Sequence, residues 1–269
     1  MKIIYDMNKK GDFIMTEKQF FSYLYGFFGT DGSPSTWGDG KLKAINLEVS
    51  IKDAEDIKNI CEKLNGTVTT RERDTNFSNN YQSINLYTSN KELIAFLIKN
   101  DFPISDKTNT IHKPTDEYDE DYFWLGVIDG DGSLGMKGDG HPYINLTTKS
   151  EQLKEDFLDY IEKLTNFRPS VNKNKRDNIY NITVGSKKAQ IIAERLYKDK
   201  EIGLKRKINQ YLLLKEWQPK NMKGVVRLPW TKEEEEDLLK LSLEDFMAKY
   251  PNRTFIAIKG KKQRMKRQV

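Results

Sequence analysis

The sequence lacks the features of a disulfide-stabilised, secreted or membrane-spanning protein. Its 269 residues include a single cysteine, Cys61, so no disulfide can form within the chain. The N-terminal apolar stretch is too short for a signal peptide, and no run approaches the ~18 apolar residues that a membrane span needs. We expect a soluble protein without a membrane partner, in a reducing compartment: the cytoplasm or nucleoid of a bacterium or phage-infected cell, or an organelle.

Acidic residues are missing from the end of the chain. The segment "KGKKQRMKRQV" holds six basic residues and no Asp or Glu. Residues 220–269 carry 13 Lys and Arg against 7 Asp and Glu, whereas residues 1–219 carry 32 against 33. A concentrated basic segment favours a polyanion partner, usually nucleic acid, although a solvated helix end would look the same.

The chain contains an internal repeat. "YLYGFFGTDGS" (23–33) and "FWLGVIDGDGS" (123–133) are both apolar runs that contain a glycine and stop at Asp-Gly-Ser. Further pairs follow in the same order at offsets of 96 to 100 residues: "INLEVS" and "INLTTK", "CEKLNG" and "IEKLTN", "INLYTSNKELIAFL" and "YNITVGSKKAQIIA". We infer two copies of one unit of roughly a hundred residues.

Each unit is expected to fold as α-β-β-α-β-β-α. Thr16 can cap the first helix, with Gln19 completing a capping box, and the second helix places Ile57, Ile60, Cys61 and Leu64 on one face before Gly66 ends it. Alternating residues predict half-buried strands, and each Gly-Asp-Gly lies where a hairpin turn belongs. In the first unit we expect helices at about 16–28, 53–66 and 90–100 and strands at 42–49, 67–74 and 81–88. This is an α+β fold: two pseudo-symmetric units, each with helices on one face of four antiparallel strands.

The opposite face of each sheet is left open in this arrangement. Its outward positions are basic in places, which would suit the groove of a nucleic acid, although an ordinary solvated sheet face would look the same. The candidate DNA-binding residues on the two sheets are Lys41, Lys43, Arg71 and Arg73 in the first unit and Lys173, Lys175 and Arg176 in the second.

Small residues form a stripe on each of the two repeated helices. Ser22, Gly26 and Thr30 are four residues apart and share one helix face, and Gly126 and Gly130 do the same in the second copy. Such a stripe lets two helices approach more closely than the usual 8–10 Å between axes. Because glycine costs about 1 kcal/mol in a helix interior, its presence in both helices predicts that they pack on each other.

That packing would bring Asp31 and Asp131 together at matching helix ends. Two carboxylates at short range raise at least one pKa unless a cation neutralises them, and oxygen ligands suit a hard ion such as Mg²⁺ or Mn²⁺. Such a site can hold the attacking and leaving oxygens of a phosphodiester. Asp-Gly-Ser alone is more often a helix-ending turn, but its duplication favours a site. A calcium loop starting at Asp129 is excluded, because Leu134 and Gly140 stand where Gly and Glu are required.

The two segments resemble the paired signature of LAGLIDADG homing endonucleases. "WLGVIDGDG" is close to the family pattern, whereas "LYGFFGTDG" has Gly29 where the first acid of the motif stands and Asp129 stands in the second copy. Asp31 and Asp131 match the second acid, which the resemblance implies holds the catalytic metals. The resemblance covers about Thr16 to Trp217 and implies a monomer with an asymmetric site.

The resemblance also implies lysines near the metals. "PISDKT" and "GLKRKI" correspond across the repeat, which nominates Lys107 and Lys207 as catalytic residues, with Lys149 at a strand end as a third candidate. Surface solvation is the alternative role for each lysine.

Residues 230–269 are expected to form a separate domain after a linker at 218–229, with the two repeats at 1–110 and 111–217. Thr231, Ser242 and Thr254 can each open a short helix, and "WTKEEE…RTFIAIKGK" resembles a Myb/SANT-type helix-turn-helix. The predicted small core consists of Trp230, Leu238, Leu241, Phe246, Phe255 and Ile258, and the predicted DNA contacts are Lys259, Lys261, Lys262 and Arg264, with Lys266 and Arg267 beyond them. The alternative is a small helical bundle that binds protein.

The sequence therefore predicts a site-specific, metal-dependent endonuclease of the homing type, which cuts both strands of a long asymmetric DNA target. Three alternatives remain at this level: a non-cleaving DNA-binding regulator or an RNA-splicing maturase on the same scaffold, and a protein-interaction module. Two adjacent acids favour the nuclease, because binding alone does not need them.

Overall fold

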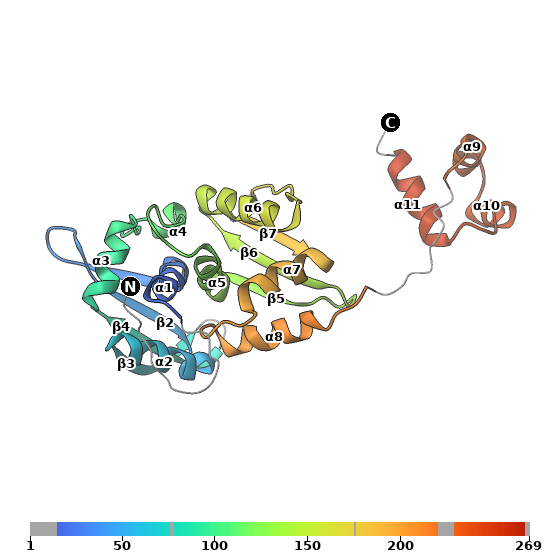
Figure 1. Cartoon of the computed structure of the whole chain (residues 1–269). Coiled ribbons are helices and arrows are strands. Elements are labelled where there is room, and N and C mark those ends of the chain that lie inside the picture. The colour runs from blue at the N-terminus through green and yellow to red at the C-terminus, as the bar shows by residue number, and fades with distance from the viewer. Residues whose placement is uncertain (1–14, 76–77, 175, 220–228, 267–269) are drawn as a thin grey trace. The chain divides into compact units, whose positions relative to one another are not determined.

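The structure, a computed structural model, describes residues 15–75, 78–174, 176–219 and 229–266 (Figure 1). The chain divides into two compact units, Met1–Pro219 and Lys220–Val269, which are treated separately below. None of the helices in the described ranges has the length and apolar character that a membrane crossing requires.

The first repeat of the larger unit follows the order expected from its sequence. Its elements are α1 (Glu17–Asp31), β1 (Gly32–Thr36), β2 (Leu42–Ser50), η1 (Ile51–Asp53), α2 (Ala54–Leu64), β3 (Thr67–Thr75), β4 (Ser78–Thr88), α3 (Lys91–Lys99) and α4 (Lys107–Thr110). The Thr16–Gln19 capping box is confirmed, with 3.2 Å between the Gln19 backbone nitrogen and the Thr16 hydroxyl. Helix α2 buries the four predicted side chains. Its C-cap is Asn65, with a φ of 49°, and not Gly66 as expected.

The second repeat has one strand fewer than predicted. Its elements are α5 (Glu120–Gly130), β5 (Gly132–Met136), β6 (Pro142–Thr148), α6 (Glu151–Thr165), β7 (Tyr180–Gly185), α7 (Ser186–Tyr197) and α8 (Lys205–Lys215). Where the first repeat has β3, the described residues form only an isolated bridge between Lys173 and Tyr180. The first repeat has the β-branched run "TVTT" at this point, whereas the second has "RPSVNKN", whose proline and asparagines favour turns.

Two antiparallel sheets result, with strand orders β1-β2-β4-β3 and β5-β6-β7. Figure 1 shows α1 and α5 side by side between the sheets, with α2 and α3 near the first and α6 and α7 near the second. The alternate residues Ile45, Leu47, Ile84 and Leu86 are fully buried beneath these helices. Their neighbours along each strand therefore occupy the opposite face of the sheet, away from these helices.

Glycine lets α1 and α5 approach backbone to backbone, as the stripe of small residues predicts. A Cβ added at Gly26 would overlap the Phe123 carbonyl oxygen and lie 2.8 Å from the Val127 nitrogen. A Cβ at Gly126 would meet the Tyr23 carbonyl oxygen in the same way. The reciprocal fit confirms that α1 and α5 pack on each other. This contact, at Gly26 and Gly126, is called the seam between the two repeats.

The smaller unit forms three helices around its own core. They are α9 (Lys232–Lys240), α10 (Leu243–Lys249) and α11 (Phe255–Lys266), and Thr231 and Ser242 cap the first two. Leu238, Phe246 and Ile258 are buried, with Trp230, Leu241, Tyr250 and Met265 packed against them. The assignment of Phe255 to this core was wrong: as the first residue of α11 it is 48% exposed, and Tyr250 packs on Phe246 instead.

Candidate functional site: an acid pair between two repeats

The seam brings the predicted acids to one place. Asp31 is the last residue of α1 and Asp131 caps the end of α5. A Cβ added at Gly130 would collide with the Thr30 side chain and lie 3.5 Å from the Asp31 carboxyl carbon. The two helix ends therefore touch at the residues that carry the acids.

Both acids have raised pKa values. Burial raises the pKa of Asp31 to about 6, and the charge of Asp131 adds to the effect. Asp131 reaches solvent, yet the surrounding protein still raises its pKa. Lys107 and Lys207 oppose both shifts. A pair of carboxylates that repel each other at two helix C-termini, the negative ends of the helix dipoles, is a site that favours a cation.

Each predicted lysine caps the helix that carries an acid. Lys107 Nζ donates to the carbonyl oxygens of Gly29 at 2.8 Å and Thr30 at 2.5 Å in the last turn of α1. Lys207 Nζ donates to the carbonyl oxygens of Ile128, of Asp129 at 2.7 Å, and of Gly132 at 2.9 Å. The two ammonium groups thus occupy equivalent places beside Asp31 and Asp131.

The two lysines differ in how far they are withdrawn from water. Lys207 is 4% exposed, and burial lowers its pKa to about 8, although the charge of Asp129 opposes the shift. Burial also lowers the pKa of Lys107, against the charges of Asp131 and Asp31. Lys149 is exposed just after β6 and contacts neither acid in the described part of the chain, so its catalytic role stays a prediction.

The departure from the motif at Gly29 has a packing explanation. A Cβ at Gly29 would collide with the side chain of Ile111, which is buried in the core. Asp129, at the matching place in the second repeat, is fully buried and accepts hydrogen bonds from Tyr23 Oη at 3.0 Å, Tyr197 Oη at 2.9 Å and the Leu204 N–H at 2.9 Å. Asp129 therefore ties helices together and is not part of the acid pair.

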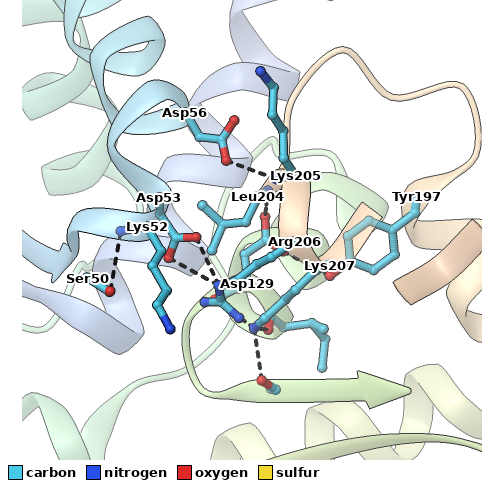
Figure 2. Close-up of polar contacts among 12 residues, drawn as sticks. Ser50, Lys52, Asp53, Asp56, Asp129, Tyr197, Leu204, Lys205, Arg206 and Lys207 are labelled. Atoms are coloured by element: carbon cyan, nitrogen blue, oxygen red, sulfur yellow. Dashed lines mark hydrogen bonds and ion pairs between the residues drawn. The ribbon is translucent and has the colours of Figure 1, made fainter. Parts of the chain in front are cut away.

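The sequence did not predict an ion pair between Asp53 and Arg206, the residue next to Lys207. Asp53, at the end of η1, accepts from Arg206 Nε at 2.9 and 3.1 Å, across 153 positions of sequence (Figure 2). Next to it, Asp56 accepts from the Lys205 N–H at 2.9 Å. These contacts fasten the first turn of α8, and with it Lys207, to the first repeat. The one signal in the sequence was the position of Arg206 next to Lys207.

The residues present fit a hard metal ion. Asp31 and Asp131 offer carboxylate oxygens, and the described residues contain no group of three or more His, Cys, Asp or Glu that could complete a metal site. In such a two-acid site the remaining coordination positions of the metal would be filled by water and phosphate oxygens, as is usual for Mg²⁺.

The open face of the first sheet carries two of the predicted arginines. Arg71 and Arg73 pair in register with Ser83 and Tyr81 on β4, and both form ion pairs with Glu48 on β2, at 3.8 and 3.1 Å. Lys43 is exposed, with its Nζ 4.4 Å from the Trp37 ring centroid, and Lys41, after the hairpin turn, pairs with Asp39 at 3.1 Å. Arg71 and Arg73 share the Glu48 carboxylate, which holds both arginines on the face of the sheet opposite the buried Ile84 and Leu86.

The open face of the second sheet is different in character. Asn145, Thr147, Asn181 and Thr183 form an uncharged network in which Thr183 Oγ1 donates to Asn145 Oδ1 at 2.7 Å. Lys173 and Arg176 take no part in this network: Lys173 is exposed, and Arg176 pairs with Asp177 at 2.8 Å. Lys175, the third predicted cation, lies outside the described residues.

The cations of the smaller unit are also unequal. Lys259 and Arg264 are exposed on α11 and Lys262 is half-buried, whereas Lys261 forms an ion pair with Glu235 at 2.5 Å. The side chain of Lys266, as well as Arg267, lies outside what the structure describes.

Comparisons with known proteins agree with this geometry. Residues 120–197 match the LAGLIDADG-like domain family. The homing endonuclease I-WcaI bound to its DNA recognition sequence is similar in structure, with a TM-score of 0.52 at 16% identity, covering 74% of this chain and 88% of that one. Two other similar structures have a TM-score of 0.45: the meganuclease I-AabMI bound to uncleaved DNA, at 10% identity over 72% of this chain and 88% of that one, and the N-terminal LAGLIDADG domain of WhiA, at 14% over 68% and 82%. No curated protein sequence matches.

Residues 120–197 therefore resemble the LAGLIDADG-like domain family, and the mixed α+β fold with antiparallel sheets is similar to that of the homing endonuclease I-WcaI.

Proposed function

We propose that the protein is a site-specific, metal-dependent endonuclease of the homing type, which hydrolyses phosphodiester bonds on both strands of a long asymmetric DNA target. One observation carries the proposal: Asp31 and Asp131 meet at the ends of two closely packed helices, in a fold like that of a DNA-bound homing endonuclease. A protein that only binds DNA has no need for two mutually repelling acids, which cost stability.

Asp31 and Asp131 would hold Mg²⁺ or Mn²⁺ between the repeats. Such an ion supplies positive charge to the phosphate and lowers the pKa of a water molecule. The acids themselves must be deprotonated to bind a metal, and Lys107 and Lys207 favour that form by lowering their pKa values.

Lys107 and Lys207 have a further role in this proposal. Their ammonium groups neutralise the carbonyl ends of α1 and α5, so a negatively charged phosphate can approach helix ends that would otherwise repel it.

The two sheets would follow the DNA on either side of the acids. Arg71, Arg73 and Lys43 supply charge on the first sheet, and the Asn145–Thr183 network supplies neutral hydrogen-bonding groups on the second. Because one chain supplies both halves, we propose that a monomer binds an asymmetric target. The smaller unit would add contacts as a helix-turn-helix module of the Myb/SANT type.

The test is a selection of cleaved duplexes from a random DNA library in the presence of Mg²⁺. We expect the wild type to select one asymmetric site, and Asp31→Asn and Asp131→Asn to bind that site while cutting it at least about a hundredfold more slowly, because affinity rests on phosphate and base contacts elsewhere. Lys99→Gln is the control: Lys99 on α3 is exposed, pairs with Asp116 at 2.6 Å and is not a predicted DNA contact, so its loss should leave the cutting rate unchanged.

Cutting at the normal rate by either asparagine variant, or robust cutting in EDTA, would contradict the proposal. Binding of a defined duplex with no cutting in Mg²⁺ or Mn²⁺ would instead support a non-cleaving DNA-binding regulator on this scaffold.

A further inference from the structure

One strongly held cation near the acid pair, Arg206, stands where the other repeat has an acid, Asp106. Asp53 is 3% exposed, and Arg206 Nε donates to both of its carboxylate oxygens, at 2.9 and 3.1 Å. The Arg206 side chain is itself 51% exposed, so its buried partner fixes one side of the guanidinium while the rest faces solvent.

Arg206 lies on the Asp31 side of the site. It is the residue before Lys207, whose Nζ caps α5. Its partner Asp53 belongs to the first repeat, whose helix α1 carries Asp31. Figure 2 shows Arg206 extending from α8 toward Asp53, and Lys205, the preceding residue, pointing away from it.

The repeat shows that this arrangement exists once. At the offset of 100 that relates "GLKRKI" to "PISDKT", Asp106 corresponds to Arg206 and Leu153 to Asp53. Asp106 precedes α4 and accepts from the Asn109 amide at 2.7 Å, and Leu153 is buried in the core. One half of the site thus has a cation where the other half has an acid.

A guanidinium has five N–H donors in a planar fork. Only Nε of Arg206 is hydrogen-bonded within the described residues, which leaves the two terminal amino groups for a ligand. Beside a site for phosphodiester cleavage the ligand that matches this fork is a phosphate, which arginine binds through two parallel hydrogen bonds.

We propose that Arg206, oriented by buried Asp53, contacts a DNA phosphate on one strand only, so that the two strands are cut at unequal rates. This inference rests on the proposed endonuclease function. It makes Arg206 a substrate-contacting residue and Asp53 a positioning residue.

The experiment follows each strand separately. The duplex selected by the wild type is labelled differently on its two strands, and Mg²⁺ starts the reaction. We expect Arg206→Gln to slow the cutting of one strand by about 10- to 100-fold, the worth of a hydrogen bond to a charged group, while the other strand keeps its rate and nicked DNA accumulates. Arg206→Lys should recover part of the lost rate, because it keeps the charge without the fork.

Two further variants separate contact from positioning. Asp53→Asn removes the charge that orients Arg206 and should slow the same strand to a smaller extent. Lys205→Gln is the matched control: Lys205 pairs with exposed Glu55 at 2.5 Å and points away, so both strands should keep their rates.

Two outcomes would overturn the inference. One is an unchanged rate on both strands in Arg206→Gln. The other is equal slowing of both strands together with a lower thermal midpoint, which would mean that the pair only fastens α8 to the first repeat.

Failure of the endonuclease proposal is distinguishable from failure of this inference. If the wild type cuts no selected duplex, affinity for a bound duplex is measured in Ca²⁺ against salt concentration. Loss of one phosphate contact in Arg206→Gln should reduce the slope of log affinity against log salt by about 0.9. A reduced slope would uphold the phosphate contact without cleavage, and an equal slope would refute it.

Discussion

Three aspartates within the twin motifs show how environment separates the roles of identical side chains. Asp129 is fully buried but accepts three hydrogen bonds, so its carboxylate is satisfied by the protein. Asp31 and Asp131 have no such set of donors among the described residues. They lie at neighbouring helix ends across the seam, where the charge of Asp131 adds to the raised pKa of Asp31. The acids left unsatisfied are the ones available to a metal ion.

At this scale we predict that Asp31→Asn stabilises the metal-free protein. The pKa of Asp31 is raised by folding from 3.8 to about 6, so the folded state holds its proton more tightly than the unfolded chain. Stability therefore falls as pH rises from about 4 to about 6, and the cost remains at neutral pH. Because the side chain is partly exposed, we expect a gain on the order of 1–2 kcal/mol in the variant, or about 2–4 °C for each kcal/mol.

The measurement is thermal unfolding in EDTA at pH 7 and pH 4. The variant should unfold at a higher temperature at pH 7, with the gain shrinking toward pH 4, where the unfolded wild type also begins to bind the proton. Asp39→Asn is the control, because hydrogen bonds from Lys41 lower the pKa of that exposed acid, and its removal should bring no gain. A wild type more stable than Asp31→Asn at pH 7 would contradict the electrostatic strain.

At the scale of elements, the seam between α1 and α5 determines the site. The separation of the acids depends on how closely two helices approach, and that approach depends on Gly26 and Gly126, where a Cβ would overlap the facing backbone. Lys107 and Lys207 then cap the same helices from segments that follow each repeat's own sheet. The acids and lysines are therefore coupled through the helix ends.

We predict that Gly26→Ala destabilises the protein, although alanine favours a helix by about 1 kcal/mol over glycine. The added methyl group meets backbone atoms of α5, which cannot move aside as a flexible side chain would. Overpacking of this kind costs about 1–3 kcal/mol, and the separation of the helices should also weaken metal binding.

Denaturant unfolding and Mn²⁺ titration of Gly26→Ala would check both effects. Gly138→Ala is the matched control: no atom lies within 4 Å of a Cβ at Gly138, so its stability and metal affinity should stay at wild-type values. Equal stability of the two alanine variants would show that the seam has room which the structure does not give it.

At the scale of the whole molecule, the smaller unit is compact and carries a net positive charge, with 13 Lys and Arg against 7 Asp and Glu. Leu238, Phe246 and Ile258 form a core of their own, and Glu234 and Arg253 form an ion pair at 2.7 Å in which both side chains are 9% exposed. The Arg253 guanidinium also lies over Trp230, at 4.4 Å from the ring centroid. These contacts hold the described helices of the smaller unit together.

We predict that a chain ending at Pro219 keeps its cutting position and loses DNA affinity. Of the predicted contacts, Lys259, Lys262 and Arg264 are available, whereas Lys261 is engaged by Glu235. Each lost phosphate contact lowers the slope of log affinity against log salt by about 0.9, so the slope should fall by roughly 2–3.

Footprints of the full-length and truncated protein on the same duplex would show whether the protected region shortens. The full-length variant Lys259→Gln is the control with one contact removed, and its slope should fall by about 0.9 with an unchanged footprint. Identical footprints and equal salt slopes for the truncated and full-length chains would favour a protein partner for these helices.

Features that depend on near neighbours and on the repeat could be predicted from the sequence alone. Helix α1 follows from its capping box, the buried face of α2 from its periodicity, and the approach of α1 to α5 from glycines four residues apart. The pairing of Asp31 with Asp131 follows because a repeat implies pseudo-symmetry, which relates distant residues without any further contact information.

The features in which the two halves differ depend on tertiary contacts. The Asp53–Arg206 pair joins residues 153 positions apart and departs from the repeat, so neither periodicity nor symmetry could predict it. In the described part of the second sheet, the place of a fourth strand is taken by the bridge between Lys173 and Tyr180. This difference and the exposure of Phe255 also depend on competition among neighbouring segments for the same surface. Local spacing determines which face of an element is apolar, but the chain must fold before a side chain meets its partner.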